Sequence, residues 1–110
     1  MGRVSGKVAL VTGAAMGLGQ ATAELLARES AKVMVSDINE ERGRVVVKGT
    51  TESGGTAVFQ RHDVGEPADW EKAIFHVLQI YGKLDILVNN AVSALRHRSR
   101  IRRWRIGDGR

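Results

Sequence analysis

The sequence predicts an α/β fold in which about four parallel strands are covered by helices on both faces. Short apolar segments alternate with segments that carry a helical spacing of apolar residues, and this alternation is typical of strand–helix–strand units. The apolar segments are nearly continuous, as in strands that are buried on both faces. The first of them runs directly into three glycines, Gly13, Gly17 and Gly19, as at a turn from a strand into a helix.

We expect the first strand at residues 8–11 and a helix from the glycine turn to about Ser30. Gly13 allows a sharp turn because glycine adopts positive φ, and the later glycines remove Cβ atoms where another group comes close. A helix N-terminus favours an anion, and the pyrophosphate of a dinucleotide is the obvious ligand. Five residues at helical spacing are expected to form the apolar stripe of this helix: Leu18, Ala21, Thr22, Leu25 and Leu26.

The second strand and the helix after it are expected at residues 32–37 and 39–53. The strand ends in an acid, Asp37, and Asn39 is the expected N-cap of the helix. A third strand over 56–62 then leads into the pair Asp63-Val64.

The clearest helical pattern lies between Pro67, which suits a first helical turn, and Gly82, which suits a helix end. A fourth strand over 84–88 follows and ends in Asn89-Asn90-Ala91. The apolar residues of the helix recur at intervals of three and four, and they are Trp70, Ala73, Ile74, Val77, Leu78 and Tyr81.

Polar residues and glycines follow every predicted strand. Right-handed crossovers place the carboxyl ends of parallel strands at one edge of the sheet, where open α/β sheets bind ligands. Taken singly, each group has a plainer explanation: a simple glycine turn, an aspartate as a helix cap, or asparagines that bridge two strands. Their shared edge favours a dinucleotide site, and the residues gathered there are Thr12, Gly13, Asp37, Asp63, Val64, Asn89 and Asn90.

These motifs resemble the short-chain dehydrogenase/reductase family over residues 5–91. The segment from Thr12 to Gly19 matches the family's TGxxxGxG, and Asn89-Asn90-Ala91 matches the start of its NNAG. Asp37 and Asp63-Val64 fall at the family's order and spacing. The resemblance implies a Rossmann-like sheet of strand order 3-2-1-4, as the N-terminal, cofactor-binding half of an oxidoreductase.

The resemblance also implies that the glycine turn and Asp37 recognise NAD. Asp37 would accept hydrogen bonds from the ribose hydroxyls and repel a 2′-phosphate. The nearby positions hold Ala15, Met16 and Ile38, none of which is a Lys or Arg that could offset this charge. NAD is therefore expected rather than NADP. The residues implied around the pyrophosphate and this ribose are Gly13, Met16, Gly17, Leu18, Gly19, Asp37 and Ile38.

Four further residues are implied at the two ends of the cofactor. Asp63 would bond the adenine amino group, and Val64 would pack on the adenine ring. Asn90 and Ala91 would line the adenosine ribose and the approach to the nicotinamide.

The sequence departs from the family after Ala91. Val92 stands where the family has glycine, and we find no further resemblance beyond it. The family's catalytic serine and Tyr-x-x-x-Lys pair are missing, since the only tyrosine, Tyr81, has Asp85 four residues on and Ser93 comes too early. We therefore expect an NAD-binding half that is inactive alone. A nucleotide-binding module without chemistry is the alternative.

The net charge of +5 comes from the last 19 residues. Residues 1–91 hold 10 basic and 11 acidic residues, whereas 92–110 hold 7 arginines and 1 aspartate. We therefore expect a Rossmann-type half-domain over 1–91 and a basic, disordered tail over 92–110. The composition change indicates a shifted reading frame or an alternative exon. An arm that binds nucleic acid or an anionic membrane, or a solvated segment without a partner, are the alternatives.

Composition also narrows the function classes. There are no cysteines, so disulfides and thiolate metal sites are excluded. His62 and His76 lack partners at metal-binding spacing, and we expect them at the surface or at strand ends. No signal peptide or membrane-spanning run is evident, so a cytoplasmic protein without a metal is expected. Nucleic-acid binding is not expected of the near-neutral body, and the sequence leaves the oligomeric state open.

Overall fold

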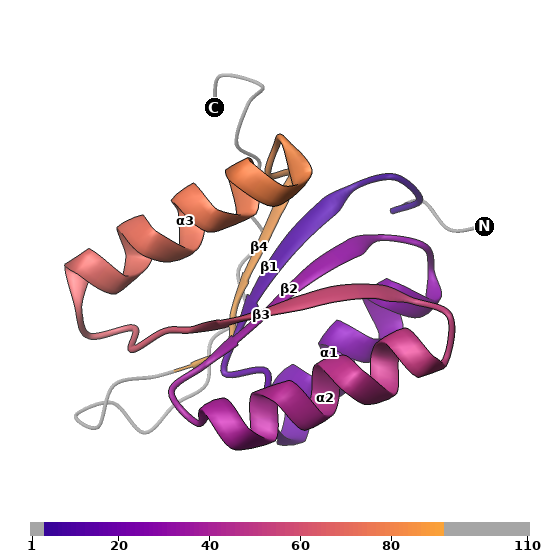
Figure 1. Ribbon diagram of the computed structural model, residues 1–110, viewed down its shortest axis with the longest axis horizontal. Coiled ribbons are helices and arrows are strands. Elements are labelled where there is room, and N and C mark those ends of the chain that lie inside the picture. The colour runs from indigo at the N-terminus through magenta and orange to yellow at the C-terminus, as the bar shows by residue number, and fades with distance from the viewer. Residues whose placement is uncertain (1–3, 92–110) are drawn as a thin grey trace.

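A computed structural model describes residues 4–91 of the protein (Figure 1). Strands and helices alternate along the whole of this range, as the sequence predicts. The elements are β1 (Val8–Thr12), α1 (Gly17–Arg28), β2 (Lys32–Asp37), α2 (Glu40–Glu52), β3 (Thr56–Arg61), α3 (Pro67–Tyr81) and β4 (Ile86–Asn89).

The four strands form one parallel sheet in the order β3-β2-β1-β4, which confirms the expected order 3-2-1-4. The central strand β1 pairs with β2, from Val8 opposite Lys32 to Val11 opposite Val35. On its other side β1 pairs with β4, from Ala9 opposite Ile86 to Thr12 opposite Asn89. Thr12 and Asn89 therefore lie side by side at the carboxyl edge.

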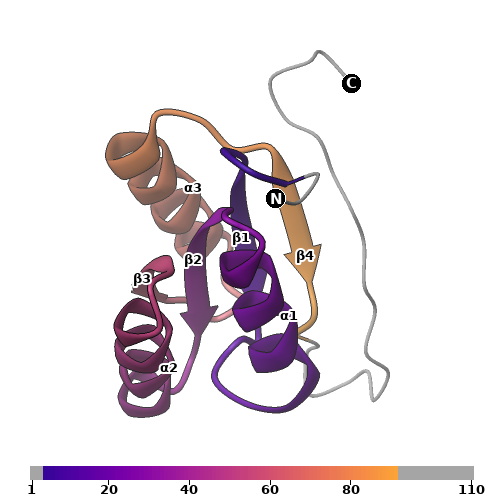
Figure 2. The ribbon, with the colours of Figure 1, turned by 90° about the vertical axis from the view of Figure 1, so that its right-hand side faces the viewer.

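Helices cover both faces of the sheet, as expected. Helices α1 and α2 lie on one face and α3 lies on the other (Figures 1 and 2). Strand β1 is buried along its whole length because it lies between these two layers. The core has two corresponding clusters, one built around Val11, Val33 and Val35 under α1 and α2, the other around Val8, Leu10 and Met34 under α3.

The expected buried face of α1 is wrong except for Leu26, which packs against the core. Leu18 and Leu25 are 54% and 51% exposed, and the residues that face the sheet are Gly19, Ala23 and Ala27. The helix lies so close to the first turn that a Cβ atom on Gly19 would lie only 2.0 Å from the carbonyl oxygen of Gly13. Close approach selects small side chains for the buried face, and the larger ones point outward.

The other predicted features agree with the structure apart from element ends and one leucine. Asn39 caps α2, accepting a hydrogen bond from the Arg42 N–H at 3.0 Å, and Gly82 ends α3 with a φ of 82°. On α3 the expected stripe faces the core except for Leu78, which is 44% exposed. His62 directly follows β3, so it lies at a strand end, one of the two expected positions, and it is buried.

Candidate functional site

The glycine turn joins β1 to α1 and lies directly against the end of the chain's fourth strand. Gly13 has a φ of +61°, which favours glycine. A Cβ atom built on it would lie 3.0 Å from both the N and the Cα of Ala91. Residues 78 positions apart in the sequence therefore form one continuous surface at the carboxyl edge of the sheet.

The N-terminus of α1 is left open towards this surface. Met16 is the N-cap, but its side chain makes no capping hydrogen bond, and the first turn contains no acidic residue. The first N–H groups of a helix have no partner within the helix, so they favour an anion. The half-exposed side chains of Met16 and Leu18 flank this turn.

Asp37 is held against the glycine turn by two backbone hydrogen bonds. Its Oδ2 accepts from the Ala15 N–H at 3.0 Å, and its Oδ1 accepts from the Asn39 N–H at 2.9 Å. An ionised carboxylate has about four acceptor positions, so two remain for hydroxyl groups of a ligand. Ile38, beside it, is 56% exposed.

Thr12 organises the opposite side of the turn, a role that the sequence analysis missed. Its hydroxyl donates to Oδ1 of Asn89 at 2.8 Å and accepts from the N–H groups of Asn90 and Ala91 at 2.9 and 3.1 Å. Asn89 therefore does bridge two strands, as one of the plainer explanations held. The only available signal was a hydroxyl residue at the end of an apolar strand.

Asn90 points from β4 towards the glycine turn. Its Nδ2 lies 3.5 Å from the Gly13 carbonyl oxygen, a weak contact. Its Oδ1 is buried and has no hydrogen-bond partner within residues 4–91. A buried acceptor without a partner is costly, and a donor supplied by a ligand would satisfy it.

Asp63 and Val64 lie in the turn between β3 and α3, and both are partly exposed. Oδ1 of Asp63 accepts from the Gly65 N–H at 3.0 Å, and the indole N–H of Trp70 donates to the Val64 carbonyl at 2.9 Å. The alternative that Asp63 caps the helix is wrong, because the N-cap of α3 is Glu66. The structure connects this turn to Asp37, since the His62 N–H donates to the Asp37 carbonyl at 3.0 Å.

The only tyrosine lies at the opposite edge of the sheet. Tyr81 ends α3 and packs on the cluster around Val8, and the Lys32 ammonium lies over its ring, 6.0 Å from the centroid. Burial raises the pKa of the Tyr81 hydroxyl above its usual value of 10.0. A general base needs a pKa near the working pH, so Tyr81 suits neither the place nor the chemistry of the candidate site.

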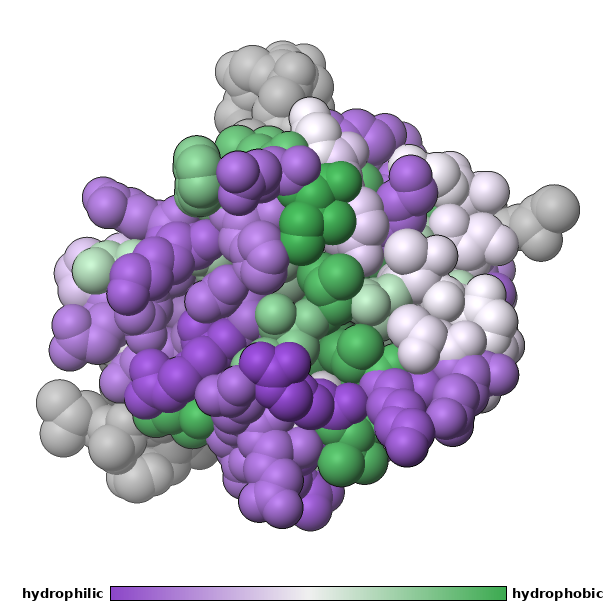
Figure 3. All heavy atoms as spheres, in the orientation of Figure 1, coloured by the Kyte–Doolittle hydropathy of each residue, from purple (hydrophilic) through white to green (hydrophobic). Residues whose placement is uncertain are grey.

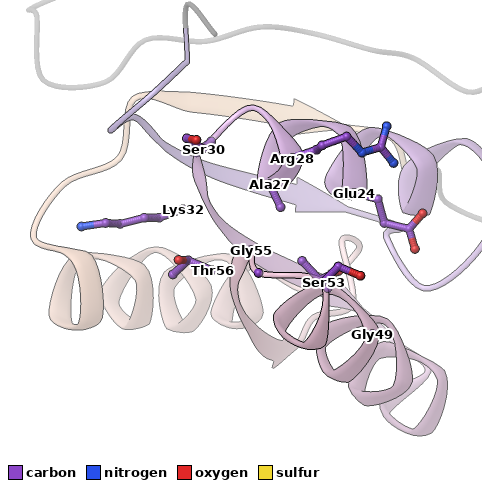
Figure 4. Close-up of a pocket in the computed structure, with 12 residues that line it drawn as sticks. Glu24, Ala27, Arg28, Ser30, Lys32, Gly49, Ser53, Gly55 and Thr56 are labelled. Carbon is purple, nitrogen blue, oxygen red and sulfur yellow. The ribbon is translucent and has the colours of Figure 1, made fainter. Parts of the chain in front are cut away.

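Two hollows in the described part of the chain lie away from the candidate residues. One, of about 610 Å³, lies between the carboxyl ends of α1 and α2 and is lined by residues such as Ala27, Ser53 and Gly55 (Figure 4). The other, of about 390 Å³, borders the outer strand β3, where apolar atoms gather between α2 and α3 (Figure 3).

Within residues 4–91, no group of three or more His, Asp or Glu side chains is placed to hold a metal ion. None of the helices in this range has the length and apolar content that a membrane crossing requires.

Comparison with known proteins identifies relatives of this chain. The family model described as short chain dehydrogenase matches residues 7–103. The chain is 46% identical over 89 residues to 2,5-dichloro-2,5-cyclohexadiene-1,4-diol dehydrogenase of Sphingobium indicum, covering 81% of this chain and 36% of the relative. It is 48% identical over 91 residues to cyclopentanol dehydrogenase of Comamonas, covering 83% and 36%.

Solved structures of dehydrogenases also match this chain in fold and sequence. A hydroxysteroid dehydrogenase from Escherichia coli matches with a TM-score of 0.80 at 37% identity, over 83% of this chain and 39% of that one. A dehydrogenase/reductase from Sinorhizobium meliloti matches with a TM-score of 0.76 at 42% identity, over 79% and 35%. The chain thus spans about a third of the length of the curated relatives it matches.

The family match ends later than the motifs suggested. It reaches residue 103, so the expectation that nothing beyond Ala91 resembles the family is wrong for the first part of the tail. The expected disorder of 92–110 concerns residues outside the described range, and the division at Ala91 stays a prediction.

Proposed function

The chain belongs to the short-chain dehydrogenase family, and we propose that residues 1–91 correspond to the NAD-binding half of a full-length member. The observation that carries this proposal is the hydrogen bond from the Ala15 N–H to Oδ2 of Asp37 at 3.0 Å. This bond brings a fixed carboxylate beside an uncapped helix N-terminus. The pair suits the ribose hydroxyls and the pyrophosphate of one dinucleotide.

The residues present fit such a cofactor. The glycine turn with Met16 and Leu18 would hold the pyrophosphate, since the N-terminus of α1 has no side-chain cap and no acidic residue in its own first turn. Asp63 and Val64 would hold the adenine, and Asn90 and Ala91 the ribose and the approach to the nicotinamide. The bound NAD would supply a hydride acceptor, and every group named here would bind or orient it.

NAD is proposed over NADP because of the charge at Asp37. Both of its oxygens are fixed by backbone N–H groups, so the carboxylate has little freedom to move away from a 2′-phosphate. The exposed side chain of Ile38 adds no compensating charge. A phosphate placed there would meet uncompensated repulsion.

We further propose that the parent activity is hydride transfer between NAD and a CH–OH or C=O group. The relatives are named for a cyclohexadienediol, for cyclopentanol and for 3-beta-hydroxysteroids, so a cyclic secondary alcohol is the proposed substrate class. These 110 residues carry no Tyr-x-x-x-Lys pair, so the chain itself is proposed to bind the cofactor without turning over substrate. A cytoplasmic location belongs to the same proposal.

Calorimetric titration of the 110-residue chain with NAD and NADP tests the cofactor proposal. We expect NAD to bind more tightly than NADP, and Asp37→Ala to weaken NAD by about 10-fold or more, since hydrogen bonds to a charged group contribute about 1.5–3 kcal/mol. Glu71→Ala, which removes an exposed acid of α3, is the matched control and should bind like wild type. Equal binding of NAD by wild type and Asp37→Ala would contradict the assignment of Asp37.

A further inference from the structure

Ser36 and His62 form a buried pair beneath the adenosine end of the proposed site. The Ser36 Oγ and His62 Nδ1 atoms lie 3.1 Å apart, and the residues are 0% and 2% exposed. Ser36 directly precedes Asp37 at the end of β2, and His62 directly precedes Asp63 after β3. Each partner is therefore one residue away from a carboxylate assigned to the cofactor.

Further contacts fix the position of His62. The backbone N–H of His62 donates to the Asp37 carbonyl at 3.0 Å. The ring of Trp70 meets the imidazole nearly at right angles, with centroids 4.3 Å apart. The imidazole therefore contacts β2 through Ser36 and α3 through Trp70. The indole N–H of Trp70 also donates to the Val64 carbonyl at 2.9 Å.

We propose, building on the NAD site proposed above, that Ser36 and His62 are positioning residues for the adenosine half of the cofactor. Neither is assigned a contact with the ligand. They hold the ends of β2 and β3 together, which fixes the separation of Asp37 from Asp63 and Val64. The pair does so with a neutral imidazole, so the affinity for the adenosine half falls when His62 takes up a proton.

The surroundings of the ring explain why the charged form is disfavoured. Burial lowers the pKa of His62 below 6.5, and the facing carboxylates of Asp69 on α3 and of Asp63 only partly oppose this. Arg61 forms an ion pair with this Asp69, at 3.7 Å. From β2 the ring meets only the Ser36 hydroxyl within hydrogen-bond distance.

A proton would also create a second buried donor. The Nε2 atom of His62 is buried and has no partner among the described residues. An imidazolium carries an N–H on both ring nitrogens. Because the N–H at Nε2 would have no acceptor in the buried position, the charged ring is more stable in water. The arrangement with the ring buried therefore takes up protons more weakly than one in which the ring has left for water, and lowering the pH below 6.5 favours the latter.

The test measures binding of AMP, nicotinamide mononucleotide and NAD by calorimetry between about pH 5.5 and about pH 7.5. In the wild-type chain, we expect NAD affinity to fall by up to about tenfold per pH unit as the pH drops below 6.5 towards the lowered pKa of His62. His62→Phe keeps a ring against Trp70 but cannot titrate. It should bind AMP about 3–10-fold more weakly than wild type at the upper pH, as expected for one lost hydrogen bond. Its affinity for NAD, which carries no phosphate monoester, should not change with pH.

A second histidine supplies the matched control. His76 on α3 bonds Oε1 of Gln60 at 2.6 Å and touches no residue assigned to the cofactor. His76→Phe should keep the wild-type pH profile, and nicotinamide mononucleotide should bind equally to all variants. The proposal is overturned if NAD binding by His62→Phe keeps the wild-type pH dependence, or if His62→Phe weakens nicotinamide mononucleotide as much as AMP at the same pH.

Ser36→Ala covers the case in which His62→Phe does not fold. It removes one hydroxyl and should also weaken AMP by about 3–10-fold, so unchanged AMP binding would overturn the proposal. If wild type binds none of the three ligands, the proposed function fails, and NMR on the free chain decides the positioning role. The amide signals of Asp37, Asp63 and Val64 should then shift with the midpoint of the His62 ring, and signals that ignore this midpoint would refute the role.

Discussion

Asp85 stabilises the amino-terminal end of the pairing between β1 and β4 through its carboxylate. Oδ2 of Asp85 accepts from the Val8 N–H at 2.9 Å, and the Asp85 N–H donates to the Val8 carbonyl at 2.9 Å. Lys83 adds an ion pair at 3.2 Å. Val8 is completely buried, so its N–H depends on this acceptor.

We expect Asp85→Ala to lower the free energy of unfolding by about 1–3 kcal/mol, because it leaves the buried Val8 N–H without a partner. Asp85→Asn keeps an oxygen in the same place and should lose less. Urea unfolding followed by circular dichroism measures both values. An Asp85→Ala chain as stable as wild type would show that the Val8 N–H finds another acceptor.

The pH dependence of the same residue has a definite sign. Burial alone raises the pKa of Asp85, but the Val8 N–H, Lys83 and the charge of Lys7 outweigh it and hold the pKa below 3.8. A lowered acid pKa contributes stability that is present above the unfolded value and is lost as the pH falls through the folded value. Wild type should therefore lose this contribution below about pH 3.8, and Asp85→Asn should not.

Sequence reasoning reached the residues of the candidate site that belong to local motifs. The turn at Gly13, the acid after the second strand and the asparagines after the fourth follow from the order of elements and the glycine spacing. The hydrogen bonds of Thr12 and the burial of His62 were beyond it. The hydrogen bonds of Thr12 span 77–79 positions, and the burial of His62 depends on Trp70 and Ser36, which the sequence does not place beside it.

Helix α2 contains two glycines, Gly43 and Gly49, whose surroundings differ. Glycine weakens a helix, and the sequence offers no reason for two of them in this helix. The structure supplies one for Gly43, because a Cβ atom there would lie 2.0 Å from Cε1 of the Phe59 ring. A Cβ atom on Gly49 meets nothing within 4 Å.

We therefore expect opposite effects from the same substitution at two positions of one helix. Gly49→Ala should raise the free energy of unfolding by about 0.5–1 kcal/mol through helix propensity. Gly43→Ala should lower it by about 1–3 kcal/mol, since the Phe59 ring must leave its place in the core. Urea unfolding of both variants tests the contrast, and equal stabilisation by the two would show that Phe59 moves without loss.

Helix α1 shows why a correct element can be given the wrong face. Its position is predicted correctly, but the stripe of Leu18, Ala21, Thr22, Leu25 and Leu26 is predicted from helical spacing alone. The helix lies against the glycine turn, so its buried face holds Gly19, Ala23 and Ala27 while Leu25 stays half exposed. Hydrophobic periodicity measures side-chain apolarity and carries no information about how closely two backbones approach.

At the scale of the whole molecule, the two edges of the sheet carry different chemistry. The carboxyl edge gathers the glycine turn, Asp37 and Asn90 through hydrogen bonds between distant segments. The opposite edge holds Tyr81 and Lys32, with the ammonium over the ring face. A strand of five residues such as β1 spans about 17 Å, so the tyrosine is separated from the candidate site by the length of the sheet.

This separation predicts that the 110-residue chain, incubated with NAD and a panel of cyclic secondary alcohols, shows no turnover above background. Proton transfer needs a group within hydrogen-bond reach of the reacting atoms. The only tyrosine is Tyr81, and all lysines fall within residues 1–91, so the tail adds no Tyr-x-x-x-Lys pair. Absorbance of reduced NAD measures the rate, with the Escherichia coli hydroxysteroid dehydrogenase as positive control. Turnover that survives Tyr81→Phe but is lost in Asp37→Ala would reveal a different proton donor at the carboxyl edge and would sink the assignment of a binding half without chemistry.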